Sequence, residues 1–165
     1  MPVLVSDTSV IIDLERGGLL ESLFLLPFEF AVPDLLFERE LKGPLGDQLI
    51  LLGLRVEELD PAELSRAIVV RRERTMLSTP DTFAFAIAEI RNWPLLTGDG
   101  ALRRYAVDQG VVTNGVLWIC DQFEDHAVLD NDRLHAGLTA ISSHPRCRLP
   151  AAEVANRLNR YAGLD

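Results

Sequence analysis

Three aspartates stand at positions where a carboxylate can take part in chemistry. Asp7 follows a short apolar run, Asp81 opens an apolar helical pattern, and Asp99 follows a second short apolar run. Carboxylates gathered at one edge of a protein repel one another unless a cation lies among them. Mg²⁺ or Mn²⁺ supplies such a charge, takes oxygen ligands and can orient a water for attack on a phosphate. The three aspartates together predict a metal site, although each alone is also explained as a helix cap or first-turn acid.

The spacing between Asp81 and Asp99 allows the two side chains to meet. The helical pattern from Ser78 to about Asn92 carries the chain roughly 18 Å away, and Pro94 prevents its continuation. The extended return to Asp99 covers roughly 20 Å. We therefore expect Asp99 to come back beside Asp81.

A fourth acid is expected from the helix predicted over residues 33–41, which contains Glu38 and Glu40. On a helical wheel, Glu40 lies toward the apolar arc, whereas Glu38 lies at the edge of that arc. A carboxylate on a buried face needs a partner, which slightly favours Glu40, but Glu38 is closer to the end of the preceding strand. Either is also explained as part of a solvated helix face.

These acids depend on the alternation of strands and helices for their placement. Strands are expected at Val3–Ser6, Phe28–Val32, Arg55–Glu58, Leu95–Thr97 and Val111–Thr113. Helical patterns separate them, which predicts a single α/β domain with a mostly parallel sheet and helices on both faces. Ligands of such sheets bind outside the carboxyl ends of the strands, where Asp7 and Asp99 fall.

The charge of the chain limits how it can meet a polyanion. Its 165 residues carry a net charge of -9, and only one of the 16 basic residues is a lysine, Lys42. No global positive field therefore attracts nucleic acid or a membrane, and a polyanion must meet a metal or local arginines. Seven arginines are candidates for neutralising RNA phosphates, each also explained as a solvated residue: Arg71, Arg72, Arg74, Arg103, Arg104, Arg146 and Arg148.

Cysteine usage and hydropathy indicate the compartment. Cys120 and Cys147 lie 27 residues apart with no CxxC or Cys/His cluster, which argues against zinc and fits a reduced cytoplasm. No apolar stretch approaches about 18 residues, so we expect neither a signal peptide nor a membrane span.

The motifs together resemble those of PIN-domain nucleases over residues 3–123. The resemblance rests on Asp7-Thr8-Ser9 after the first strand, a glutamate in the helix after the second, Asp81 opening an alanine-rich helix, and Leu95-Leu96-Thr97-Gly98-Asp99. It implies a three-layer α/β/α fold and an endoribonuclease dependent on Mg²⁺ or Mn²⁺. Such proteins are commonly VapC-like toxins of type II toxin-antitoxin modules. An RNA substrate, an antitoxin partner and a homodimer are therefore expected.

The same resemblance assigns roles to individual residues. Asp7, Asp81 and Asp99 match the catalytic and metal-binding acids of the family, and the small hydroxyl residues that support them match Thr8, Ser9 and Thr97. Counting from Pro33 favours Glu38 as the fourth acid, whereas the family's Glu-Leu pairing favours Glu40 before Leu41. Both glutamates are retained as candidates, with Glu38 preferred. Residues 1–125 are expected to form the nuclease core, and residues 126–165 a C-terminal helical extension of the same domain.

Two other classes of function compete with this interpretation. Phosphotransfer proteins and phosphatases with an aspartate pocket use a lysine at the end of a late strand, and the single lysine, Lys42, is far from such a position. A degenerate PIN-like protein would retain the acids but act by binding a partner.

Overall fold

Five parallel strands form the centre of the protein in a computed structural model that describes residues 1–164. The strands are β1 (Val3–Ser6), β2 (Glu29–Pro33), β3 (Arg55–Glu57), β4 (Leu95–Leu96) and β5 (Thr113–Asn114). Their order is β3-β2-β1-β4-β5, with Val3 opposite Glu29 and Val5 opposite Leu95. The first strand is therefore central, and the chain winds outward from it in both directions.

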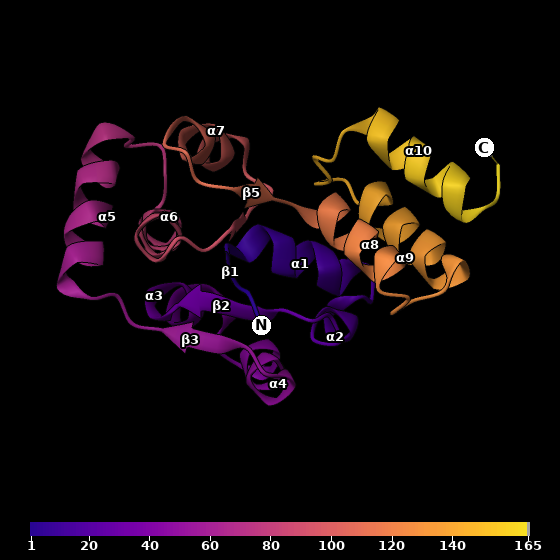
Figure 1. Ribbon diagram of the computed structural model, residues 1–165, viewed down its shortest axis with the longest axis horizontal. Helices are drawn as coiled ribbons and strands as arrows, with labels where there is room; N and C mark the ends of the chain where they lie inside the picture. Colours follow the sequence, from indigo (N-terminus) through magenta and orange to yellow (C-terminus); the bar gives the residue numbers. More distant parts are fainter. Residues whose placement is uncertain (165) are drawn as a thin grey trace.

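Helices connect the strands and cover the sheet (Figure 1). In chain order they are α1 (Thr8–Arg16), α2 (Leu20–Leu23), α3 (Asp34–Leu36), the π-helix η1 (Phe37–Leu41), α4 (Pro44–Leu52), α5 (Pro61–Glu73), α6 (Thr79–Arg91), α7 (Gly100–Asp108), α8 (Val116–Asp125), α9 (Asn131–Ser143) and α10 (Ala151–Tyr161).

The sheet divides the core into two layers, because successive side chains of a strand point to opposite faces. Leu4 and Leu96 pack in a cluster with α1, α2, α8 and α9, whereas Val5 and Leu95 pack against α5, α6 and α7. This arrangement confirms the predicted three-layer α/β/α fold with a parallel central sheet.

Several element boundaries differ from the sequence-based expectation. The helix expected over residues 19–26 is only the short α2, and the last strand lies at Thr113–Asn114 rather than at residues 111–113. The helix expected over residues 33–41 begins as α3 and continues as the wider η1, in which the Lys42 N–H donates to the Phe37 carbonyl at 2.9 Å. This last difference changes where Glu38 and Glu40 point.

The C-terminal helices lie on the same side of the sheet as α1. α9 packs against α1 and α8, and α10 packs along α9, with Val154 and Tyr161 in the larger core cluster. Among residues 1–164, no helix combines the length and apolar character needed to cross a bilayer.

Candidate active site

Asp7 lies at the carboxyl end of the central strand and is 2% exposed. Its carboxylate caps α1 by accepting from the Val10 N–H at 3.3 Å, and it accepts from the Ser9 hydroxyl at 2.7 Å. The Thr97 hydroxyl donates to its second oxygen. The position is therefore both a helix cap and a buried carboxylate with three donors around it.

Ser9 and Thr97 connect Asp7 to the loop that carries Asp99. The Gly98 N–H donates to the Ser9 hydroxyl at 2.9 Å, and the Asp99 N–H donates to the Thr97 hydroxyl at 3.0 Å. A Cβ added at Gly98 would lie 3.1 Å from the Ser9 hydroxyl oxygen, so a glycine permits this close approach. The two hydroxyl residues thus fix the relative positions of the β1 and β4 ends.

Asp81 and Asp99 both lie at the first turn of a helix. Asp99 is the N-cap of α7 and accepts from the Ala101 N–H at 3.4 Å. Asp81 lies in the first turn of α6, which Ser78 caps. Because Asp7 caps α1, the positive ends of three helix dipoles meet at these acids and offset part of their mutual repulsion.

Glu40, and not Glu38, lies among these acids. The Thr8 hydroxyl donates to the Glu40 carboxylate, whereas Glu38 forms an exposed ion pair with Lys42 at 3.0 Å. The sequence-based preference for Glu38 rests on counting from Pro33 and on its closeness to the strand end, whereas the helical wheel and the Glu-Leu pairing favour Glu40. The wider turn of η1 changes the spacing on which that counting depends. We use the term acid cluster for Asp7, Glu40, Asp81 and Asp99.

The charges of the acid cluster interact. Burial and, to a lesser degree, the nearby charge of Asp81 raise the pKa of Asp7 to about 6, against the opposing hydrogen bonds of Thr97 and Ser9. Burial also raises the pKa of Asp81, and the charges of Asp99 and Glu40 act in the same direction. Repulsion therefore links all four carboxylates, which is the electrostatic condition that a bound cation relieves.

The acid cluster is an open arrangement. Within residues 1–164, no three His, Cys, Asp or Glu side chains converge as a preformed metal cage. Mg²⁺ is commonly held by only one or two carboxylates together with waters and substrate phosphates, so an all-protein cage is not required for such an ion. The all-oxygen donor set and the mutual repulsion of the carboxylates fit a hard divalent cation.

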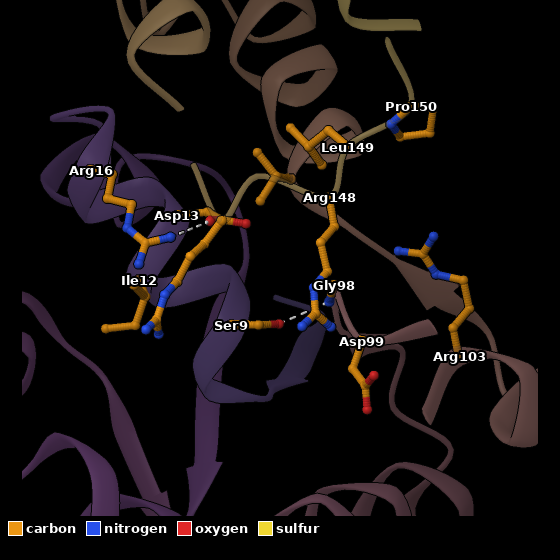
Figure 2. A pocket seen from close by; sticks show the side chains of 12 residues that line it. Ser9, Ile12, Asp13, Arg16, Gly98, Asp99, Arg103, Arg148, Leu149 and Pro150 are labelled. Carbon is orange, nitrogen blue, oxygen red and sulfur yellow. Dashed lines mark hydrogen bonds and ion pairs between the residues drawn. The ribbon is translucent and has the colours of Figure 1, made fainter. Parts of the chain in front are cut away.

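The structure also places two arginines around a cavity beside Asp99, and one of them, Arg103, is a sequence-based candidate for neutralising RNA phosphates. Arg103 donates to the Thr97 carbonyl at 2.7 Å, and Arg16, at the other end of α1 from Ser9, lines the same cavity (Figure 2). Arg16 was not among the candidates because its sequence context indicated only a helix end. Arg71 and Arg72 border a separate cavity between α5 and α6, whose wall includes Thr79 and Thr82 from the start of α6.

The family comparison agrees with this geometry. The family model DUF3368, described as a PIN domain, matches residues 3–162. The chain therefore belongs to the PIN-domain family and has a nuclease fold. A search of curated proteins found no match.

Proposed function

We propose that this protein is a divalent-metal-dependent endoribonuclease that hydrolyses RNA phosphodiester bonds at the acid cluster. The observation that carries the proposal is the electrostatic linkage of the four carboxylates, which come from β1, η1, α6 and α7. Membership of the PIN-domain family supports the hydrolase class.

The residues of the chain have separable tasks in this proposal. Asp7, Asp81, Asp99 and Glu40 would hold Mg²⁺ or Mn²⁺, with Thr8, Ser9 and Thr97 orienting their oxygens. When bound, the cation would stabilise charge on phosphate oxygens and make a nearby water more acidic.

The test is a cleavage assay on structured RNA with Mn²⁺, comparing the wild type with Asp7→Asn and Asp99→Asn. We expect both substitutions to reduce cleavage at least 100-fold, roughly the contribution of a positioned acid-base group or metal ligand. Asp108→Asn, at the far end of α7, is the matched control and should retain activity. Equal cleavage by the wild type and Asp7→Asn would refute the proposal.

The finer proposal is that the protein is the toxin of a type II toxin-antitoxin module, acting as a cytoplasmic homodimer with an antitoxin partner. Its support is the resemblance of the motifs to VapC-like toxins. The apolar stretches 19–30 and 116–129 are largely core, so they do not supply a dimer surface. Exposed apolar side chains remain on α5, among them Leu64, Ile68 and Val69.

Two observations would support a toxin. Expression should arrest growth in the wild type but not in Asp99→Asn, and a neighbouring gene should encode a small DNA-binding protein.

The alternatives are separable from this proposal. The pairing of Lys42 with Glu38 away from the acid cluster argues against an aspartate-pocket phosphotransfer protein. A non-catalytic, partner-binding protein would show no Mn²⁺-dependent thermal shift, and no change in thermal shift after Asp99→Asn.

A further inference from the structure

Arginines from three separate elements line one cavity of about 300 Å³, which we call the arginine cavity. Arg16 belongs to α1, Arg103 to α7, and Arg146 and Arg148 to the segment between α9 and α10. Figure 2 shows the Arg148 side chain extending from that segment toward Ser9, Gly98 and Asp99. The arginine cavity therefore opens directly beside the acid cluster.

Most of this positive charge has no carboxylate partner. Arg16 pairs with Asp13 at 3.5 Å, but none of the ion pairs formed within residues 1–164 involves Arg103, Arg146 or Arg148. Five of the other arginines form ion pairs within residues 1–164: Arg55, Arg66, Arg91, Arg157 and Arg160. Three guanidinium groups without a carboxylate partner around one cavity concentrate positive charge at this place in a protein whose net charge is -9.

The segment between α9 and α10 holds its two arginines toward this cavity. The Arg146 N–H donates to the His144 ring at 3.1 Å, and the Cys147 N–H donates to the His144 carbonyl at 2.9 Å. Cys147 borders a different cavity, together with residues of α10, so the residue between the two arginines points elsewhere. Leu149 packs on the larger core cluster and fixes the end of the segment.

We infer that the arginine cavity is a phosphate-binding site, which holds a phosphate of the nucleic acid strand next to the one at the acid cluster. The identity of that strand as RNA rests on the proposed function. Guanidinium groups donate paired hydrogen bonds that match phosphate oxygens, and they keep their charge at any physiological pH. The C-terminal helices then have a specific role, because they place Arg146 and Arg148 at the site.

A second cavity of about 270 Å³ adjoins the first and shares Arg103, Leu149 and Pro150 with it. Its wall includes Glu153 and Trp118, and the Trp118 ring packs on Phe28 with the ring centroids 5.6 Å apart. The two cavities together offer space for a phosphate and its attached nucleotide. This arrangement favours a nucleic acid over a free inorganic anion as the occupant.

The test measures binding without cleavage. The full chain is titrated in EDTA against a 3′-fluorescein-labelled single-stranded oligoribonucleotide, made with and without a 5′-phosphate, and anisotropy is recorded. Arg146→Gln/Arg148→Gln should bind at least tenfold more weakly than the wild type, since it loses charge-assisted hydrogen bonds. The salt dependence of its binding should also decrease by roughly 0.7 in slope for each lost phosphate contact.

Two controls separate a specific site from general electrostatics. Arg133→Gln removes one positive charge, half the number lost in the double variant, from the exposed start of α9, outside the cavity, and should bind within about twofold of the wild type. Orthophosphate should compete with the oligonucleotide for the wild-type protein, a measurement that needs no variant. Equal binding by the double variant and the wild type, or an equal loss in Arg133→Gln, would overturn the inference.

The 5′-phosphate identifies which phosphate is bound. If the 5′-phosphate strengthens binding to the wild type but not to the double variant, the cavity holds a terminal phosphate. If the double variant loses the same affinity for both oligonucleotides, the cavity holds an internal phosphate. The experiments distinguish a failure of this inference from a failure of the proposed function. Arginine-dependent binding without Mn²⁺-dependent cleavage would refute only the nuclease activity. Mn²⁺-dependent cleavage with an unchanged KM in the double variant would refute only the phosphate site.

Discussion

The Thr97 hydroxyl donates a hydrogen bond to the Asp7 carboxylate across 90 residues of sequence. Thr97 is fully buried, and the same hydroxyl accepts from the Asp99 N–H. One side chain therefore sets the geometry of two acids and lowers the pKa of one of them. The parallel pairing of β1 with β4 brings these residues together.

Thr97→Val should raise the pKa of Asp7 above its value of about 6, because the lost hydrogen bond favours the ionised form. The substitution should also destabilise the fold by about 1 kcal/mol. A carbon-detected NMR titration of the metal-free protein measures the first effect, and urea unfolding the second. Thr139→Val on α9 is the control, with no expected change at Asp7. An unchanged or lower Asp7 pKa would show that the hydrogen bond is unimportant.

Asp7→Asn should stabilise the metal-free protein at neutral pH. The folded pKa of about 6 exceeds the ordinary value of 3.8, so the folded state binds the proton more tightly than the unfolded state. The free energy of folding that comes from this tighter proton binding is fully present below about pH 4 and is lost as the pH rises through about 6. Urea unfolding should therefore favour Asp7→Asn by about 2 kcal/mol at pH 7, since the amide nitrogen replaces one accepting oxygen at a cost of about 1 kcal/mol, and should not favour it at pH 4. Mn²⁺ should stabilise only the wild type, and an Asp7→Asn variant that is less stable at both pH values would contradict this reasoning.

Arg91→Met should strongly destabilise the protein. Its guanidinium donates to both oxygens of Glu63, at 2.7 and 3.0 Å, and the Glu63 side chain is fully buried. Removing the arginine leaves an uncompensated buried carboxylate, which costs roughly 3–5 kcal/mol. Lys42→Met, which breaks an exposed pair, should change the free energy of urea unfolding by less than about 1 kcal/mol. Glu63→Gln added to Arg91→Met should restore part of the loss; no restoration would mean that lost packing dominates.

Local signals were sufficient to predict much of this molecule. Short apolar runs predicted the strands, and their alternation with helices predicted the parallel sheet, because a crossover connection requires a helix between parallel strands. Asp7 and Asp99 were expected at the strand ends from the same pattern, and the structure brings both to that edge. Their roles in catalysis stay predictions.

Features that depend on distant contacts could not be predicted. The wide turn of η1 has no signature in hydrophobic periodicity, so counting residues from Pro33 could not locate the fourth acid, whereas the helical wheel favoured Glu40, which lies among the acids. The arginine cavity joins Arg16, Arg103 and Arg148 from three elements, and only the docking of the C-terminal helices brings them together. The sequence named Arg103 and Arg148 as candidates for contacting RNA phosphates, but it gave no indication that they share a cavity with Arg16.

Glu40→Gln and Glu38→Gln form a matched pair that tests the acid cluster. They remove the same charge two residues apart in η1, but only Glu40 is linked to Thr8 and raises the pKa of Asp81. Glu40→Gln should weaken Mn²⁺ binding, measured by calorimetry, by roughly 10- to 100-fold, the range for residues that hold or orient a metal. Glu38→Gln should leave the affinity within about twofold, because its exposed pair with Lys42 contributes little. An equal loss in both variants would indicate a general effect of charge, and a loss confined to Glu38→Gln would move the site to the other face of η1.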